Sequence, residues 1–329
     1  MTERKDKGIR CGLCPRCCLL LPGQGGECRI RVNVDGRLQS VTYGRPCSVH
    51  VDPVEKKPLF HYLPGTRILS LATVGCNLHC RNCQNLEISQ GNPEDLPAYE
   101  LPPADVPALA RKQGCPAVAY TYTEPLVYYE YTRDCSRACR QAGLRNAIVT
   151  AGYINPGPLG ELCKTIDAAQ VDIKAFSDKF YRENCDATLQ PVLDGIEIMK
   201  AEGVFLELSN LVIPTLNDSD ELLRGLCRWV VEHVGPETPF HFLRFFPQFR
   251  MTHLPPTPAE TLLRARDAAR AEGLQHVYIG NLDVPGGEDT ACAGCGKVLI
   301  QRRRFVVTVN RVQDGRCPDC GRAVNGVWK

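Results

Sequence analysis

The sequence predicts an α/β fold, an open (β/α)6 partial TIM barrel, flanked by two small cysteine-rich modules. Between residues 68 and 280, short β-rich runs alternate with helical patterns, as in consecutive βα units around a parallel sheet or barrel. Six such units are too few to close an eight-fold barrel, and a doubly wound sheet is the alternative. The 329 residues, 43% of them apolar, are enough for a large core.

The expected elements follow one another in regular order. We expect strands at 68–74, 117–122, 146–150, 171–175, 204–208, 239–245 and 276–279. We expect helices at 104–113, 125–142, 158–168, 190–202, 218–234 and 258–272. The resulting division is an N-terminal four-cysteine metal module and lead-in (1–66), the barrel (67–286) and a C-terminal zinc ribbon (287–329).

Charge and hydropathy limit the compartment and the partners. A formal net charge of +2 gives no general electrostatic reason to expect a nucleic acid or a membrane as partner. The first ten residues lack the apolar stretch of a secretion signal, and no later run reaches the ~18 apolar residues of a membrane span. We therefore expect a cytoplasmic protein, in which 19 cysteines indicate metal ligands or buried thiols rather than disulfides.

Three cysteines, Cys76, Cys80 and Cys83, directly follow the first expected strand. A structural tetrahedral site uses four protein ligands, whereas three thiolates on a four-iron cube leave one iron open. An open coordination position indicates catalysis. The alternative is a zinc site completed by His79 or a distant residue, but His79 adjoins Cys80 and would be strained in reaching the same metal.

Four cysteines near the C-terminus form two C-x2-C-G knuckles, which is the pattern of a zinc ribbon. They are Cys292, Cys295, Cys317 and Cys320. Tetrahedral Zn²⁺ accepts four such thiolates, and its binding helps to fold a module this small. A rubredoxin-like iron site is the alternative.

The segment from Cys76 to Gln90 resembles the cluster motif of radical S-adenosylmethionine (SAM) enzymes. Its continuation is similar to the AmmeMemoRadiSam-system branch, which is related to pyruvate formate-lyase activating enzymes. The resemblance extends to the N-terminal cysteines, to residues 51–61 and to the C-terminal knuckles. It departs from the family at Asn82, where an aromatic residue usually precedes the third cysteine; we retain Asn82 as a contact to the adenine of SAM.

This resemblance implies a cofactor pair and a reaction. SAM would bind the open iron of a [4Fe-4S] cluster held by Cys76, Cys80 and Cys83. One electron would cleave SAM to a 5′-deoxyadenosyl radical, which would abstract a hydrogen atom from the substrate in a closed, dry site.

The N-terminal cysteines also form a set with four ligands. Cys11, Cys14 and Cys28 are joined by Cys17 or Cys18, and the spacing in the related family selects Cys18. We expect zinc here, and an auxiliary iron-sulfur cluster is the alternative because thiolates bind both.

Two further strand ends resemble SAM-binding segments of the family. Thr123 and Glu124 follow the second strand, where backbone carbonyls and the acid would receive the SAM ammonium. The alternative is that Glu124 only opens the next helix. Thr150 and Gly152, after the third strand, match a segment near the SAM ribose, and a plain turn is the alternative.

The expected catalytic residues are Lys174 and His241. Asp172 and Lys174 alternate onto one face of the fourth strand and match the family's Asp-x-Lys motif, which implies contact with SAM or substrate. A structural ion pair is the alternative. His241 falls on a matching strand in relatives, whereas a lone histidine in an apolar strand is otherwise a core residue; Arg244 lies near it.

The sequence thus predicts an oxidoreductase that acts on a large substrate such as a protein or RNA. Activation of a glycyl-radical enzyme is one version of this function. The expected partners are a flavodoxin- or ferredoxin-type one-electron donor and Memo-type or AMMECR-type proteins, with no membrane. A zinc-stapled nucleic-acid- or protein-binding module without radical chemistry is the rival prediction.

Overall fold

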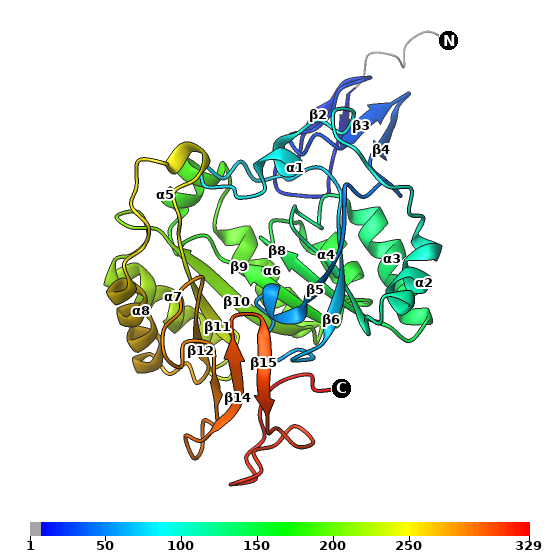
Figure 1. Ribbon diagram of the computed structural model, residues 1–329. Helices are drawn as coiled ribbons and strands as arrows, with labels where there is room; N and C mark the ends of the chain where they lie inside the picture. Colours follow the sequence, from blue (N-terminus) through cyan, green and yellow to red (C-terminus); the bar gives the residue numbers. More distant parts are fainter. Residues whose placement is uncertain (1–7) are drawn as a thin grey trace.

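An eight-stranded sheet forms the centre of the protein in a computed structural model that describes residues 8–329 (Figure 1). The strand order is β12-β11-β10-β9-β8-β7-β6-β5. Strands β6 to β12 pair in parallel, and β5 is an antiparallel strand at one edge. Because neighbours in the sheet are neighbours in the sequence, the order lacks the reversal that defines a doubly wound sheet. Residues 1–7, which belong to the predicted N-terminal module, lie outside the described residues.

All seven expected strands are present in this sheet. The sheet comprises β5 (Ser48–Pro53), β6 (Arg67–Ala72), β7 (Ala117–Tyr120), β8 (Arg145–Thr150), β9 (Ala168–Asp172), β10 (Phe205–Val212), β11 (Phe240–Arg244) and β12 (Val277–Gly280). The expected range 171–175 was placed too late, because Ala168, Ala169 and Gln170 pair with β10 despite their low β-propensity. Lys174 therefore follows its strand instead of lying within it.

The six expected helices are present and lie around the outside of the sheet (Figure 1). They are α2 (Val106–Lys112), α3 (Tyr129–Gln141), α4 (Pro156–Cys163), α6 (Gln190–Ala201), α7 (Asp220–His233) and α8 (Ala259–Ala271), with shorter helices α1 (Leu86–Gln90) and α5 (Asp178–Phe180) in the loops. Each long helix buries one apolar face, as Leu226 and Val230 of α7 illustrate. Within the described residues, no helix has both the length and the apolar character needed to span a membrane.

Two small β structures flank the sheet at its two sides (Figure 1). The N-terminal one consists of the pairs β1 (Ile9–Arg10) with β2 (Leu19–Leu20) and β3 (Arg31–Val34) with β4 (Arg37–Ser40). The C-terminal one is a three-stranded antiparallel sheet of β13 (Thr290–Ala291), β14 (Val298–Arg303) and β15 (Val306–Asn310).

The C-terminal β structure is fastened to the segment between β5 and β6. The buried guanidinium of Arg302 lies over the Phe60 ring at 4.2 Å from its centroid and donates to the Phe60 carbonyl. The indole of Trp328 packs on the His61 ring, with 5.7 Å between centroids. Buried contacts of this kind fix the orientation of the hairpin between β14 and β15.

Candidate functional site

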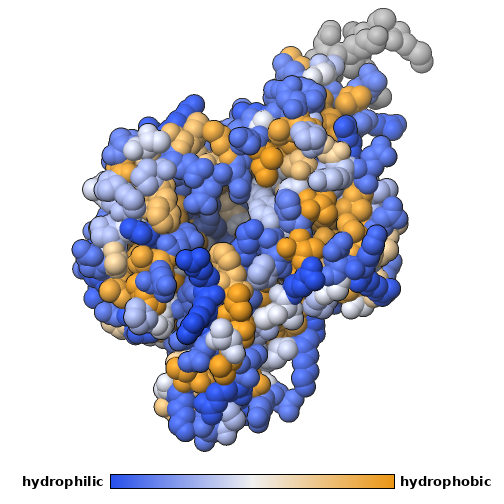
Figure 2. All heavy atoms as spheres, viewed as in Figure 1, coloured by the Kyte–Doolittle hydropathy of each residue, from blue (hydrophilic) through white to orange (hydrophobic). Residues whose placement is uncertain are grey.

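A cavity of about 450 Å³ opens at the carboxyl ends of most parallel strands. Figure 2 shows the surface hollowed near its centre, between the N-terminal and C-terminal β structures. The central cysteines and most of the expected SAM- and substrate-binding residues line it: Cys76, Cys80, Asn82, Cys83, Thr123, Glu124, Thr150, Asp172, Lys174 and His241. Parallel strands that end at one edge bring these distant positions together.

The three central thiols lie on a loop that follows β6. Backbone hydrogen bonds fix this loop, from His79 N–H to the Cys185 carbonyl at 2.9 Å and from Arg81 N–H to the Asn184 carbonyl at 2.8 Å. Burial raises the pKa of the Cys76 thiol well above its usual value. A thiolate at this position therefore needs a positive partner, which a metal centre provides.

The spacing of the central thiols differs from that of a zinc site. Among residues 8–329, the C-terminal cysteines are the one group of Cys, His, Asp or Glu whose ligand atoms all lie within 4.8 Å of one another. The triad of Cys76, Cys80 and Cys83 is more widely spaced, as expected when each sulfur binds a different iron of a cube. The three thiols therefore fit a [4Fe-4S] cluster.

His79 is engaged away from the triad. Its Nδ1 lies 2.8 Å from Asp186 Oδ2, and its Nε2 lies 3.3 Å from the Glu27 carbonyl oxygen. One form of the zinc alternative uses this ring as the fourth ligand, and these contacts give both of its ring nitrogens other partners.

Glu124 is buried beside the triad and holds two strand ends together. Its carboxylate accepts hydrogen bonds from Thr150 Oγ1 at 2.6 Å, Ala151 N–H at 2.8 Å and Leu126 N–H at 3.1 Å. Burial raises the pKa of this carboxyl, and the three donors oppose the rise. Thr123 uses its hydroxyl to bond the Thr73 carbonyl at 2.7 Å, which ties β7 to β6.

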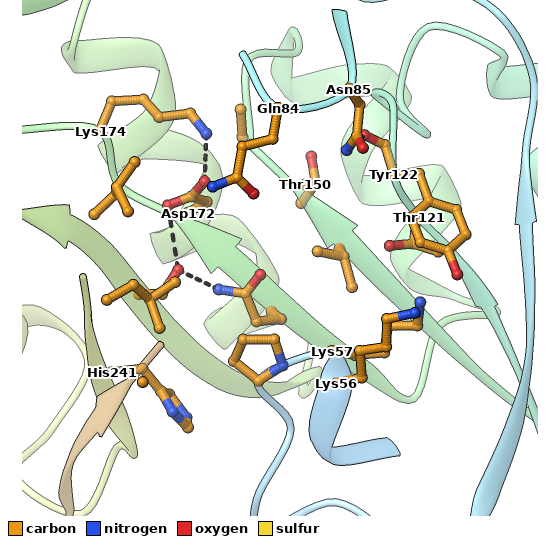
Figure 3. A pocket seen from close by; sticks show the side chains of 18 of the residues that line it. Lys56, Lys57, Gln84, Asn85, Thr121, Tyr122, Thr150, Asp172, Lys174 and His241 are labelled. Carbon is orange, nitrogen blue, oxygen red and sulfur yellow. Dashed lines mark hydrogen bonds and ion pairs between the residues drawn. The ribbon is translucent and has the colours of Figure 1, made fainter. Parts of the chain in front are cut away.

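Asp172 and Lys174 form an ion pair that faces the cavity (Figure 3). Ser209 Oγ donates to Asp172 Oδ1 at 3.2 Å, and Gln170 Nε2 donates to Ser209 Oγ at 2.6 Å. Burial lowers the pKa of Lys174, but the adjacent Asp172 carboxylate outweighs it, so the pKa lies well above its usual value. The cavity thus presents a fixed ammonium group.

His241 lies on another wall of the cavity, held by its neighbours (Figure 3). Its Nε2 lies 2.9 Å from Glu207 Oε2, and its ring stacks on Tyr278 with 5.0 Å between centroids. Glu207 also accepts the backbone N–H groups of Phe60 and His61. These contacts fix the orientation of the imidazole.

Two of the residues expected near SAM or substrate, Gly152 and Arg244, do not line the cavity. Gly152 adopts φ +70°, a backbone region that favours glycine, and donates its N–H to Thr150 Oγ1 at 2.9 Å. It shapes the turn behind Thr150. Arg244 donates to the Thr257 carbonyl at 2.9 Å and lies over the Phe246 ring.

The sequence interpretation missed a charged cluster on the opposite wall. Asp52 accepts hydrogen bonds from Lys56 Nζ at 2.8 Å, from Lys57 Nζ at 2.7 Å and from the Tyr122 hydroxyl. Figure 3 shows the two lysines beside Tyr122, across the cavity from Lys174. The adjacent lysines before the first barrel strand were the available signal, but nothing in their spacing placed them in the cavity.

Burial affects the two charges of this cluster differently. It lowers the pKa of Lys57 to about 8, although Asp52 acts in the opposite direction. Burial alone would raise the pKa of Asp52, but two ammonium groups and a hydroxyl outweigh it and hold that pKa well below its usual range. Asp52 is ionised because it accepts hydrogen bonds from three donors. Lys57 has one carboxylate partner and shares it with Lys56 and Tyr122.

The C-terminal cysteines form a compact tetrad. Cys292 Sγ lies 3.6 Å from Cys320 Sγ, and Cys295 Sγ lies 3.7 Å from Cys317 Sγ. Four thiolates at ~2.3 Å from one Zn²⁺ would be separated by about 3.8 Å. The four thiols therefore fit a single tetrahedral metal ion.

Residues 70–226 match the family model of the Radical SAM superfamily. This part of the chain is a domain of the radical SAM superfamily. The chain is 44% identical to an uncharacterized protein of Methanocaldococcus jannaschii, in a match that covers 97% of this chain and 96% of that protein. It is 30% identical to the pyruvate formate-lyase-activating enzyme of Clostridium pasteurianum, over 46% of this chain and 64% of that enzyme.

A solved structure shares the fold. The Streptococcus suis SuiB structure bound to precursor peptide SuiA superposes with a TM-score of 0.51 at 16% identity, over 70% of this chain and 51% of SuiB. A domain of this superfamily implies a [4Fe-4S] cluster and SAM as cofactors. The widely spaced triad beside a cavity fits both.

Proposed function

We propose that this radical SAM enzyme cleaves SAM at the Cys76–Cys80–Cys83 site and acts on a macromolecular substrate admitted to the cavity. The observation that carries the proposal is three thiols that lie in the wall of a cavity of about 450 Å³ and, among residues 8–329, are not gathered as closely as the C-terminal tetrad. When bound, the reduced cluster and SAM supply a 5′-deoxyadenosyl radical that abstracts a hydrogen atom.

The polar walls of the cavity suit the two ends of the SAM amino acid. The Lys174 ammonium attracts its carboxylate, and the Asp172 carboxylate holds that ammonium in place. Glu124 accepts three hydrogen bonds, and a carboxylate offers about four acceptor positions, so one remains for the SAM ammonium. Asn82 and Thr150 complete this side of the cavity.

The opposite side of the cavity is left for the substrate. His241 and Lys57 lie there, both held in place by buried acids. Phe305, from the hairpin between β14 and β15, also lines the cavity and shields it from water. We assign His241 and Lys57 to substrate positioning.

The proposal also covers the type of barrel, the metal of the C-terminal module and the cellular compartment. The sequential strand order and the outer helices support an open (β/α)6 partial barrel. The sulfur spacing of Cys292, Cys295, Cys317 and Cys320 supports a zinc ribbon. We place the enzyme in the cytoplasm.

The names of the relatives support a role as an activating enzyme. The Clostridium pasteurianum relative is named for activation of pyruvate formate-lyase. We propose a similar role here, in which hydrogen abstraction creates a glycyl radical on a partner protein. A flavodoxin- or ferredoxin-type donor supplies the electron, and Memo-type or AMMECR-type proteins are the partners to test first.

Anaerobic purification followed by a SAM-cleavage assay tests this function. The protein should be brown, with absorption near ~400 nm from an iron-sulfur cluster, and the reduced protein should release 5′-deoxyadenosine. A colourless, zinc-only protein would falsify the proposal and favour a zinc-stapled binding module. Deuterium transferred from a candidate partner into 5′-deoxyadenosine identifies the substrate.

A further inference from the structure

The N-terminal cysteines surround a second, much smaller cavity, apart from the one described above. Five thiols line it: Cys11, Cys14, Cys17, Cys18 and Cys28. Leu13, Leu20 and Val127 supply apolar walls. Thiols gathered in an apolar enclosure are the arrangement in which proteins hold iron-sulfur clusters or zinc.

The spacing of these thiols separates the two kinds of site. In the C-terminal tetrad, the sulfurs lie as close as 3.6 and 3.7 Å and all within 4.8 Å, as one zinc ion requires. The N-terminal thiols share one cavity, yet in residues 8–329 they form no group within that limit. A four-iron cube needs the wider spacing, because each thiolate binds a different iron atom.

Two buried polar atoms beside the thiols lack partners. Arg31 and Asn77 line the cavity, and both are more than nine-tenths buried. Arg31 donates through Nη2 to Glu130 at 2.6 Å, but its Nε has no hydrogen-bond partner, and neither has Asn77 Oδ1. Buried polar groups are nearly always paired, so the unpaired Arg31 N–H indicates a hydrogen-bond acceptor that the protein atoms do not supply. An N–H of Arg31 can donate to a sulfur of an anionic cluster.

The thiol cavity lies directly against the loop that carries the central triad. Asn77, which lines the cavity, is the residue that follows Cys76. Arg16 also lines it and donates to the Asn77 carbonyl. A Cβ added to Gly75 would lie 2.7 Å from the Cys28 carbonyl oxygen, so the two segments are in close contact.

We propose that Cys11, Cys14, Cys18 and Cys28 hold a [4Fe-4S] cluster that passes single electrons to the central site. A one-electron donor protein of the flavodoxin or ferredoxin class reduces this cluster. The cluster returns to its oxidised form when the electron moves to the cluster at Cys76, Cys80 and Cys83. The relay rests on the proposed function, whereas the presence of the N-terminal cluster does not.

A variant that lacks the central site tests the N-terminal cluster alone. In Cys76→Ala/Cys80→Ala/Cys83→Ala, anaerobically reconstituted with iron and sulfide, the brown colour should persist with about four iron atoms and about one zinc per chain. An iron-free variant with about two zinc atoms per chain would overturn the proposal. Because SAM cleavage is not measured here, failure of the proposed function leaves this result intact.

Electron paramagnetic resonance of the reduced variant tests the coordination. Four thiolates leave no open iron, so addition of SAM should not change the signal of the N-terminal cluster. In the wild-type protein, SAM should change a second signal, from the central cluster. A response to SAM in the triple variant would contradict coordination by four cysteines.

A ligand variant tests the relay. Cys14→Ser/Cys28→Ser should lose about half of the iron, while Cys17→Ser, the matched change at a thiol of the same cavity, should keep all of it. SAM cleavage driven by a reduced flavodoxin should fall at least about 10-fold in the double variant, and cleavage driven by dithionite should fall far less. An equal fall with both reductants would refute the relay. If the double variant does not fold, the triple variant still decides whether the cluster exists.

Discussion

The C-terminal tetrad and the central triad use the same side chain at different spacings. The tetrad brings four sulfurs within 4.8 Å of one another, outside the large cavity. The triad offers three, farther apart, in the wall of that cavity, and its neighbouring histidine is bound elsewhere. A complete shell of protein ligands stabilises a module, whereas an incomplete one leaves a position for chemistry. Loss of the two sites should therefore have different consequences.

Removal of the metal from the tetrad should have the largest effect on stability. Cys317→Ser should unfold residues 287–329 locally, because thiolate-bound zinc contributes on the order of 10 kcal/mol to a module this small. Hydrogen exchange in β14 and β15 should rise steeply, while the iron content stays unchanged. Asp319→Asn, a change close to the same site, is the control. If the zinc-free Cys317→Ser variant kept the same protection from hydrogen exchange, the metal would have no role in stabilising this module.

Loss of one triad thiol should abolish chemistry while the fold persists. Cys80→Ala should reduce 5′-deoxyadenosine release at least about 100-fold, since even outer-shell changes at metal sites cost 10–100-fold. The control is Cys47→Ala, at a half-buried thiol that does not line the large cavity. Equal cleavage by the Cys80 and Cys47 variants would refute the cluster assignment.

Glu124→Gln should affect both stability and SAM binding. The amide group replaces one acceptor oxygen with a donor, although three donors point at this carboxylate. We expect a loss of about 3 kcal/mol in unfolding free energy and weaker SAM binding, because a buried donor is left unpaired. Denaturant unfolding and calorimetric SAM titration measure these two effects, with the exposed Glu87→Gln as control. An unchanged affinity for SAM would exclude Glu124 from the binding site.

Lys57 should give the smallest effect, a dependence of stability on pH. Its folded pKa of about 8 lies below the value of an unfolded lysine, so the unfolded state binds more protons above about pH 8. The stability of wild type relative to Lys57→Met should therefore rise with pH, by about 1.5 kcal/mol between about pH 8 and 9.5. Urea unfolding measures this difference, and Lys56→Met, at the half-exposed neighbour, should not show it. A difference that stays flat or falls would contradict the burial of a charged lysine.

The parallel strands and outer helices could be predicted because periodicity and glycine positions are local signals. β5 was not predicted, since Ser48–Pro53 is a short edge strand that depends on antiparallel pairing with β6. The start of β9 was missed for a similar reason: Ala168 and Gln170 join the sheet through their neighbours. Tertiary pairing overrides weak propensity at both places.

Within the site, the sequence located the residues that follow parallel strands. Cys76, Glu124 and Asp172 share one cavity because carboxyl ends of parallel strands meet at one edge. Lys57 and Phe305 could not be found in this way, since they come from segments outside the βα units. The distances between sulfur atoms, which distinguish the N-terminal cysteines from the C-terminal tetrad, likewise cannot be derived from the spacing of cysteines along the sequence.

The docking of Arg302 also has a consequence for biosynthesis. The cavity wall that contains Phe305 is made more than two hundred residues after Cys76 of the triad. A nascent chain therefore exposes its cluster-binding thiols at least until Arg302 has been made and reaches Phe60. Iron-sulfur delivery can precede closure of this wall of the cavity.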